Sequence, residues 1–271
     1  MKYCVDFRRT GEYIKTADEI IIPFAIANQD FVDILMGRDE LINGHRLIIH
    51  INEEEEFIQH DFLKMFVPLQ DKQIHFALRF NDYQQEHQAF YQQLKEHNIN
   101  FFFTTNVDTW DIFYGLADIG VSDIYITNDL GFELNKLGPI AHAKNISLRA
   151  FPNVCQTSWR HGNTIKSFFI RPEDVSIYAE YIDVLEFYGP REQQEIYYKI
   201  YAKDKKWFGN LQEIIIGLSH ELDSRFIMPL FGGVRTSCCK RCLKDNSCSI
   251  CGLITQDLAT TLKNNNQYFK Y

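Results

Sequence analysis

The chain has 271 residues, of which 45% are hydrophobic, 24% are charged and 14% are aromatic. This composition excludes an intrinsically disordered chain, and the length suffices for one large domain or two small ones with a substantial core. The net charge of −8 argues against a protein that coats nucleic acid without specificity, although it is compatible with a local basic patch.

Short apolar runs, rich in β-branched and aromatic residues, recur along the first two thirds of the chain. Each is bounded by polar or turn residues and has the length of one buried strand. Their starts lie roughly 15–28 residues apart, which leaves room for a crossover helix between successive parallel strands. In chain order, the predicted strands span residues 19–25, 46–51, 73–80, 100–105, 123–127, 146–151, 167–171 and 182–187.

Segments between these runs carry apolar residues at helical spacing, namely residues 53–66, 83–97 and 130–144. Strands alternating with helices predict an α/β fold, and eight of them predict a (β/α)8 TIM-like barrel of the triosephosphate-isomerase type. A doubly wound open sheet is the alternative, but no glycine-rich turn follows the first strand to mark a dinucleotide site.

Tyr188, Gly189 and Pro190 form a break after the eighth predicted strand. We therefore expect two parts, a barrel over residues 1–188 and a helical extension over residues 189–271. In the extension, helices are predicted over residues 192–201, 211–222 and 253–262, the last two flanking a cysteine-rich segment.

Five of the seven cysteines lie within the 14 residues from Cys238 to Cys251. Two Cys-x2-Cys turns there each present two sulfurs toward one point, and four thiolates satisfy tetrahedral zinc or hold an iron–sulfur cluster. The sequence therefore predicts a small four-cysteine metal-binding module with structural zinc, an iron–sulfur cluster being the alternative. The predicted metal ligands are Cys239, Cys242, Cys248 and Cys251.

The cysteine usage and the N-terminus predict a cytoplasmic protein. Disulfide scaffolds are typical of short secreted chains, whereas clustered thiols with a metal suit a reducing compartment. The first six residues lack the apolar core of a signal peptide, and no run approaches the ~18 uncharged apolar residues of a membrane-spanning helix. We expect no association with a membrane.

In barrels of the predicted type, the active site lies at the carboxyl ends of the strands and in the loops that follow. Three arginines at such positions come from different strands and could converge on an anionic substrate by bidentate hydrogen bonds. The predicted substrate-binding residues are Arg79, Arg149, Arg171, Asn128 and His50.

Two carboxylates at the same end of the predicted barrel, Glu186 and Asp129, are the candidates for a catalytic acid or base. The competing interpretation is structural, because polar side chains at strand ends also cap helices and balance charge between loops. Asn128 and Asp129 in particular suit the N-cap of the helix that follows them.

The stretch Gly-Val-Ser-Asp-Ile-Tyr-Ile-Thr-Asn-Asp-Leu-Gly at residues 120–131 resembles the fifth-strand region of the collagenase-like peptidase family (family U-32). In that family, a similar run with alternating hydrophobic residues ends in Asp-Leu-Gly before a helix. The helix and strand that follow, at residues 137–149, and the glutamate-bearing strand at residues 183–187 are also similar. The resemblance spans about residues 99–188.

The resemblance implies a TIM-like barrel and, in several branches of the family, iron–sulfur clusters bound by cysteines. It also implies hydroxylation of RNA bases or of a cofactor, since members are largely associated with those reactions despite the peptidase name. This chain departs from the family after the glutamate strand, where Tyr188-Gly189-Pro190-Arg191 replaces a Ser-Gly-Arg-Cys-like segment. Its clustered cysteines also come late in the chain. The resemblance therefore carries no catalytic residue over.

Three functions are compatible with these patterns. The first is an enzyme that modifies, by hydroxylation, a nucleic acid or another anionic substrate. The second is a catalytically inactive barrel that serves as an interaction subunit of a larger assembly, nucleic-acid-associated or from a phage, and aromatic residues after the barrel motivate it. These residues are Tyr197, Tyr198, Tyr201, Trp207 and Phe208. The third is a peptidase, for which the sequence shows neither a catalytic dyad nor a hydrolytic zinc motif.

Overall fold

The computed structural model of the chain describes residues 1–6, 16–24, 44–52, 69–154, 168–218 and 224–227, and the single positions 35, 37, 38, 42, 58, 66 and 236. The predicted helix over residues 53–66 is described only at its positions 58 and 66. The cysteine-rich segment and the predicted helix over residues 253–262 lie outside the described residues.

Parallel strands of the described residues form one nine-stranded sheet in the order β5-β4-β3-β2-β1-β9-β8-β7-β6. The strands are β1 (Lys2–Asp6), β2 (Glu19–Pro23), β3 (Arg46–His50), β4 (Phe76–Phe80), β5 (Phe101–Phe103), β6 (Asn106–Val107), β7 (Asp123–Ile126), β8 (Ser147–Ala150) and β9 (Val184–Glu186). The order follows the chain around the sheet, as expected when each strand is laid beside its predecessor.

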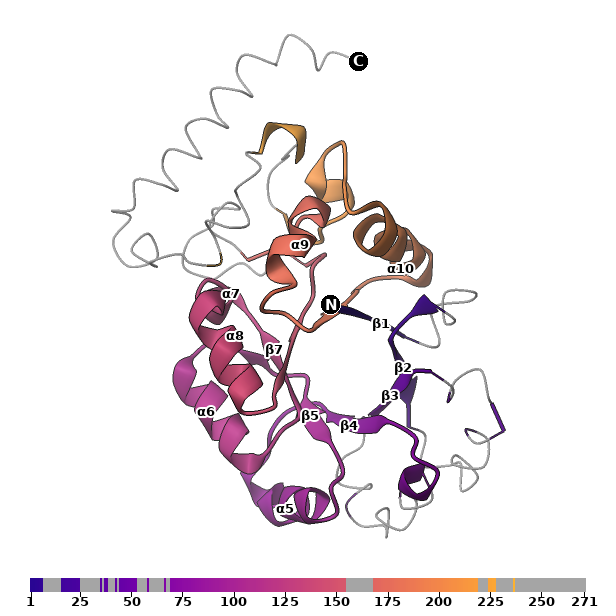
Figure 1. The fold of residues 1–271 in the computed structure, drawn as a ribbon, viewed down its shortest axis with the longest axis vertical. Helices are drawn as coiled ribbons and strands as arrows, with labels where there is room; N and C mark the ends of the chain where they lie inside the picture. Colours follow the sequence, from indigo (N-terminus) through magenta and orange to yellow (C-terminus); the bar gives the residue numbers. More distant parts are fainter. Residues whose placement is uncertain are drawn as a thin grey trace.

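The two ends of this sheet meet at residues 101–107, because β5 and β6 are consecutive pieces of one segment. β5 pairs with β4 and β6 pairs with β7, so this segment connects the two ends of the curled sheet. A hydrogen bond from Ser122 N to Phe101 O (2.9 Å) links the two sides of this bend. Figure 1 shows the curled sheet. The described chain is thus an α/β barrel of parallel strands, which confirms the predicted fold class at that level.

The strand β1 was not among the strands predicted from the sequence. It pairs in parallel with β2 on one side and with β9 on the other. Only Cys4 and Val5 of its five residues are buried, so its apolar run is too short to stand out in the sequence. Pairing on both sides, rather than local pattern, makes this segment a strand.

The predicted strand over residues 167–171 is wrong in the part that the structure describes. Residues 169–171 belong to no strand, and Phe168 makes only an isolated bridge. The ring of Phe168 packs edge-on against Phe132 and Tyr178, with centroids 6.2 and 6.0 Å apart. It also covers Gly131, where a Cβ atom would come within 2.5 Å of the ring. Side-chain packing, not strand pairing, buries this apolar run.

Helices follow several of the strands. They are α5 (Gln88–Glu96), α6 (Trp110–Ile119), α7 (Asn128–Gly131), α8 (Leu134–Ala143), α9 (Val175–Tyr178) and α10 (Arg191–Tyr198), with short 3-10 turns η3 (Gln85–His87), η5 (Pro172–Asp174), η7 (Leu211–Glu213) and η8 (Ser224–Phe226). The prediction over residues 83–97 is confirmed by η3 and α5. The prediction over residues 130–144 is confirmed as α-helix but is broken into α7 and α8.

The helix α6, which the sequence analysis did not pick out, has clear end signals. The Thr109 side chain accepts a hydrogen bond from Ile112 N and so caps the first turn. Gly120 ends the helix with a φ of 86°, a left-handed conformation that glycine adopts without a Cβ penalty.

Two apolar layers stabilise the barrel. The larger lies between the outer face of the sheet and the helices and loops that cover it, and it includes Leu78, Leu137 and Tyr178. The smaller fills the inside of the ring, where strand residues of the alternate face meet. It consists of Cys4, Ile21, Ile48, Ala77, Phe102, Tyr125 and Val184. Because both faces of each strand are covered, the strands read as near-continuous apolar runs.

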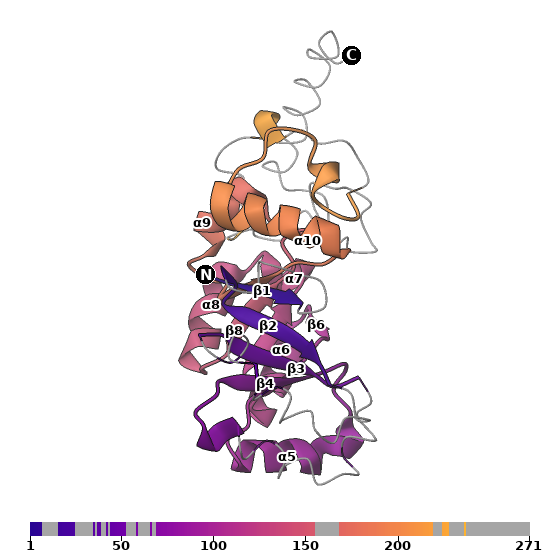
Figure 2. The same cartoon turned by 90° about the vertical axis from the view of Figure 1, so that its right-hand side faces the viewer.

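After β9, the chain packs directly on the barrel. The predicted helix over residues 192–201 is confirmed as α10, which continues into a π-helical turn, η6 (Lys199–Asp204). In this stretch the Tyr198 hydroxyl donates to Thr16 O (2.7 Å) and the Tyr201 hydroxyl donates to Ile170 O (2.9 Å). Figure 2 shows α9 and α10 beyond β1, at the end of the molecule away from α5. The division at residue 188 stays a prediction.

The prediction of a helix over residues 211–222 is wrong where the structure describes it. Residues 211–213 form only the 3-10 turn η7, and Ile216 makes an isolated bridge to Val154. Leu211, Ile214 and Ile215 are buried, so their apolar character reflects packing of an irregular segment.

No helix among the described residues is long and apolar enough to cross a membrane.

Candidate functional site

Charged side chains gather inside the barrel, on the strand face that points away from the helices. Alternation along each parallel strand directs every second residue inward, and the register places inward residues of neighbouring strands side by side. Cys4 lies beside Glu19, Glu19 beside Arg46, and His50 beside Arg79. The buried charged residues of this interior are Glu19, Arg79, Asp123, Arg149 and Glu186, and the half-buried Arg46 joins them.

The charged residues near the amino ends of the strands form a closed set of contacts, which we name the lower network (Glu19, Arg46, Asp123, Arg149). Arg46 Nη1 and Nη2 donate to the two carboxylate oxygens of Asp123 at 2.8 and 2.7 Å. Arg149 Nη1 lies 2.7 Å from Glu19 Oε2 and 2.9 Å from Asp123 Oδ1. Arg46 Nη1 also reaches Glu19 Oε1 at 3.2 Å. Two cations and two carboxylates thus neutralise one another.

Charged and polar residues toward the carboxyl ends of the strands form a second set, which we name the mouth cluster (His50, Arg79, Tyr125, Glu186). Arg79 Nη1 donates to Glu186 Oε1 at 2.9 Å and lies 3.3 Å from the Tyr125 hydroxyl. The Tyr125 hydroxyl donates to Glu186 Oε2 at 2.5 Å. Arg149 Nη2, at 3.5 Å from Glu186 Oε2, connects the mouth cluster to the lower network.

The third contact of Arg79 defines the state of His50. Arg79 Nε donates to His50 Nδ1 at 3.1 Å. Because a guanidinium only donates, Nδ1 accepts, and a neutral His50 therefore carries its proton on Nε2. The tautomer follows from the hydrogen bond and not from an observed proton.

The electrostatics of the interior keep the carboxylates of Asp123 and Glu186 ionised. Burial alone raises the pKa of Asp123 and of Glu186, but the neighbouring guanidinium groups outweigh it and hold the pKa of each carboxyl below its usual range. Burial, reinforced by the charge of Glu186, raises the pKa of the Tyr125 phenol and of the Cys4 thiol. At neutral pH, Tyr125 is therefore a neutral donor to an ionised Glu186.

One edge of the Arg79 guanidinium makes no hydrogen bond to the described residues. Its Nε and Nη1 have the partners given above, whereas Nη2 has no hydrogen-bond partner among the described residues. The Arg79 side chain is 11% exposed, and Arg79 is the last residue but one of β4. The mouth cluster thus holds a cation in a fixed orientation, with one donor group that has no partner in the described part of the chain.

Aromatic rings extend the mouth cluster toward the solvent. Tyr125 stacks on Phe151 with centroids 5.0 Å apart and an interplanar angle of 6°, and Tyr188 meets Phe151 edge-on at 6.2 Å. Tyr188 is 57% exposed. Its backbone is held by the buried Asn153, whose side chain donates to Tyr188 O (2.6 Å) and accepts from Tyr188 N (3.0 Å). An exposed aromatic on a fixed backbone is suited to contact a planar ligand.

The predicted site residues fall into two groups. Arg79, Arg149, His50 and Glu186 come together inside the barrel, although Arg149 is fully buried and pairs mainly in the lower network. Arg171 does not join them, because it is buried in a bidentate ion pair with Asp174, at 2.7 and 2.8 Å.

The remaining predicted residues of the barrel, Asn128 and Asp129, are the first two residues of α7, directly after β7. The N-cap position of this helix belongs to Thr127, which makes no side-chain capping hydrogen bond. The predicted metal ligands Cys239, Cys242, Cys248 and Cys251 lie outside the described residues. Within the described part of the chain, no group of three or more His, Cys, Asp and Glu side chains could hold a metal ion.

The lower network was not predicted, although a pattern in the sequence indicates it. Three apolar runs begin with a charged residue: Glu19 before three isoleucines, Arg46 before Leu-Ile-Ile, and Asp123 before Ile-Tyr-Ile. In parallel strands such residues share one end of the sheet, so opposite charges at this position are expected to meet. Reading them as mere boundaries of the runs hid the network.

Comparison with known proteins yields structural similarities only. No family model and no curated protein matches the chain. A tryptophan synthase from M. tuberculosis is similar at 9% identity, over 69% of this chain and 82% of that one, with a TM-score of 0.43. A mutant tryptophan synthase alpha-subunit from Pyrococcus furiosus is similar at 13% identity, over 79% and 97%, with a TM-score of 0.41.

A third similar structure is a conserved protein of unknown function from a locus in Enterococcus faecalis, at 13% identity over 75% of this chain and 66% of that one, with a TM-score of 0.40. At these identities and TM-scores, none of the three assigns a function to this chain.

Proposed function

We propose that the carboxyl end of the barrel is the functional site, and that the chain binds and modifies there a nucleic acid or another nucleotide-like anionic substrate. In this proposal the ring of strands is a complete (β/α)8 TIM-like barrel, in which sites lie at this end. Hydroxylation is the modification that the resemblance to family U-32 suggests.

The unpartnered edge of Arg79 carries the proposal. A guanidinium held by Glu186, Tyr125 and His50 loses little freedom when it binds a ligand, so its remaining donor can engage a phosphate or a carbonyl oxygen at low entropic cost. Arginine is suited to this task because it stays charged and donates in a fixed geometry.

The aromatic pair at the mouth supports a substrate with a planar base. Tyr188 stands exposed beside Phe151, which itself stacks on Tyr125 of the mouth cluster. Stacking of a base on an aromatic side chain contributes about 1–3 kcal/mol in single-stranded nucleic-acid binding. A base on Tyr188 and an anionic group on Arg79 would together define the substrate class.

Within this proposal, Glu186 is a positioning residue for Arg79. Both of its oxygens already accept hydrogen bonds, from Arg79 and from Tyr125, and it is only 6% exposed. Asp129 and Asn128 follow β7 at the same end of the sheet and remain the candidates for direct contact with the substrate.

Binding of a fluorescent single-stranded RNA, followed by anisotropy, tests the proposal. Arg79→Met is expected to weaken binding about 10- to 100-fold, the loss that one charge-assisted hydrogen bond implies. Lys136→Met is the matched control, because Lys136 is an exposed cation on α8 that makes only a 4.0 Å contact with Glu133.

Because Arg79→Met removes a partner of a buried carboxylate, the double variant Arg79→Met with Glu186→Gln checks that any loss comes from the missing donor. It removes both charges of the pair and avoids an uncompensated one. Equal RNA binding by wild type, by Arg79→Met and by the double variant would contradict the proposal.

We propose further that Cys239, Cys242, Cys248 and Cys251 bind structural zinc, with an iron–sulfur cluster as the alternative. The support is the doubled Cys-x2-Cys spacing. Anaerobic purification with metal analysis and a visible spectrum distinguishes them. One zinc per chain without colour supports the structural module, and about four irons with a brown colour support a cluster. A metal-free protein contradicts both.

A second candidate function, an interaction subunit of a larger assembly, is favoured by exposed apolar side chains. Of the aromatic residues that motivated it, Tyr197, Tyr198 and Tyr201 are buried and Phe208 is 72% exposed. On α6, Ile112 and Tyr114 are 42% and 41% exposed. Size measurement of the protein in its native lysate tests this candidate, which a monomer of 31.9 kDa would contradict.

The third alternative, a peptidase, has the least support. The described cysteine, Cys4, is fully buried inside the barrel, and burial together with the charge of Glu186 raises the pKa of its thiol, so it is a poor nucleophile. Release of fluorescence from a labelled casein substrate at a rate above that of a heat-treated sample would support a peptidase.

A further inference from the structure

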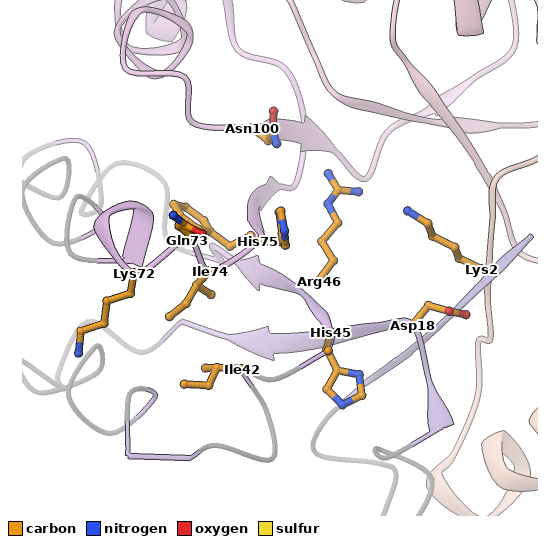
Figure 3. Close-up of a pocket in the computed structure, with 12 residues that line it drawn as sticks. Lys2, Asp18, Ile42, His45, Arg46, Lys72, Gln73, Ile74, His75 and Asn100 are labelled. Carbon is orange, nitrogen blue, oxygen red and sulfur yellow. The ribbon is translucent and has the colours of Figure 1, made fainter.

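A cavity of about 860 Å³ opens at the end of the barrel opposite to the mouth cluster. Its lining comes from the amino ends of β1, β3 and β4 and from the segments that precede β2 to β5. Figure 3 shows this cavity with its polar side chains. A volume of this size is within the range of small-molecule sites, about 300–1,000 Å³.

The charge of the lining is positive. It contains the cations Lys2, Arg46 and Lys72 and one carboxylate, Asp18. Asp18 Oδ2 already accepts a hydrogen bond from Tyr3 N at 2.8 Å. Within the described part of the chain, no ion pair engages Lys2 or Lys72. In a chain with a net charge of −8, such a concave basic surface concentrates anions locally.

Arg46 links the cavity to the interior. Its Nη1 and Nη2 are fixed by Asp123 and Glu19, and 18% of its side chain stays exposed. Its Nε has no hydrogen-bond partner among the described residues. Figure 3 shows the Lys2 and His75 side chains beside that of Arg46, whereas Lys72 extends away from it. The interior ion pairs thus preorganise a donor at the wall of the cavity.

We propose that this cavity binds a small phosphorylated organic molecule of about nucleotide size. A phosphate monoester carries a charge of about −1.5 to −2 near neutral pH and presents three acceptor oxygens on one centre. It therefore suits the donors gathered at Lys2 and Arg46 better than carboxylates on separate carbon atoms, as in citrate. His75 adds an exposed imidazole that can donate a hydrogen bond. This site is separate from the mouth cluster, because the lower network lies between them, and its ligand does not require an aromatic platform.

Isothermal titration calorimetry of the full chain with inorganic pyrophosphate, AMP and citrate tests the proposal. We expect pyrophosphate and AMP to bind with dissociation constants below about 1 mM and citrate to bind at least tenfold more weakly. Lys2→Gln and His75→Ala should each weaken pyrophosphate binding about five- to tenfold, because each removes one donor. Lys136→Gln, which removes an exposed lysine elsewhere, should leave it unchanged.

Two results would overturn the proposal: absence of pyrophosphate binding at about ten times the expected dissociation constant, or citrate binding as tight as that of pyrophosphate. Equal weakening by Lys136→Gln and Lys2→Gln would also overturn it, because the affinity would then reflect overall charge. Arg79→Met is expected to leave pyrophosphate binding unchanged. Failure of the mouth proposal therefore leaves this one standing, and the reverse also holds.

Discussion

The lower network and the mouth cluster both pair guanidinium groups with carboxylates and differ in composition. The lower network holds two arginines and two carboxylates, whereas the mouth cluster holds one of each together with a tyrosine and a histidine. In the lower network, Arg46 and Arg149 share the carboxylates of Glu19 and Asp123, and Asp123 also accepts from Ser122 at 2.6 Å. In the mouth cluster, Arg79 pairs with the single carboxylate of Glu186, and its Nη2 has no partner among the residues that the structure describes.

The difference teaches which charges serve the fold and which serve a ligand. A buried network in which each guanidinium contacts two carboxylates favours one arrangement of the strands, because a slip in register would separate these charges. Arg46 Nε and Arg79 Nη2 have no partner among the described residues, and the ion pairs of each arginine fix its orientation. The paired groups stabilise the fold, and these two donors are the ones proposed to bind ligands.

Removal of Arg149 is expected to have the largest effect on this comparison. Arg149→Met leaves Glu19 and Asp123 with one guanidinium instead of two, inside a fully buried site. Breaking a buried ion pair on one side costs about 3–5 kcal/mol. Urea denaturation should show this loss, whereas Lys136→Met should change the free energy of unfolding by less than about 0.5 kcal/mol. A loss below that level for Arg149→Met would mean that the lower network does not stabilise the fold.

Acid should weaken the lower network next. The pKa of Asp123 and that of Glu186 are lower in the folded chain than in the unfolded chain, where carboxyl pKa values are about 4. The stability that they contribute is therefore complete above that pH and is lost as the pH falls toward the folded values. We expect the free energy of unfolding to fall progressively as the pH is lowered below about 5.

The pH profile of Asp123→Asn provides the control for this expectation. The variant starts from a lower stability at neutral pH, since Arg46 and Arg149 lose a charged partner. Its stability should then depend less steeply on pH below about pH 4, because one linked proton is gone. Parallel profiles for wild type and Asp123→Asn would show that this carboxyl does not carry the acid sensitivity.

Neutralising Glu186 should have an intermediate effect and act mainly on the mouth. Glu186→Gln keeps the side-chain shape but removes the charge that holds Arg79, so we expect a loss of about 1–2 kcal/mol in stability. Binding of the fluorescent RNA should weaken about tenfold, with partial recovery in Glu186→Asp. Unchanged RNA affinity with reduced stability would assign Glu186 to the fold alone.

The smallest effect on stability is expected at the rim. Tyr188→Ala removes a side chain that is 57% exposed, so the free energy of unfolding should change by less than about 0.5 kcal/mol. RNA binding should nevertheless weaken, because a stacking surface is lost. Phe208→Ala is the matched control, as Phe208 is a 72% exposed aromatic outside the mouth. Equal RNA affinity of the two variants would contradict a stacking role for Tyr188.

Local pattern was sufficient for most of the barrel strands. The runs that became β2, β3, β4, β5, β7, β8 and β9 are buried on both faces, and such strands are visible as apolar runs. The same rule failed at Phe168, whose run is buried without pairing, and at β1, where only Cys4 and Val5 are buried. A sequence indicates which residues are buried, but it does not show whether strand pairing or side-chain packing buries them.

Three residues of the mouth cluster, His50, Arg79 and Glu186, were named from the sequence, whereas Tyr125 and the pairing of these residues were not. The expectation that Arg79, Arg149 and Arg171 converge followed from their positions after or near strand ends. Only the structure shows that Arg171 turns to Asp174, three residues along the chain, and that Arg79 meets Glu186 across the ring.

The sequence by itself determined the α/β class and the positions of most of the parallel strands, because periodicity and turn residues act over a few neighbours. Tertiary structure alone decided that β1 lies between β2 and β9 and which carboxylate neutralises which guanidinium. Those outcomes depend on register between strands far apart in the chain, where Arg149 lies between Glu19 and Asp123. The sequence shows which residues are charged, whereas the fold determines which residue each of them pairs with.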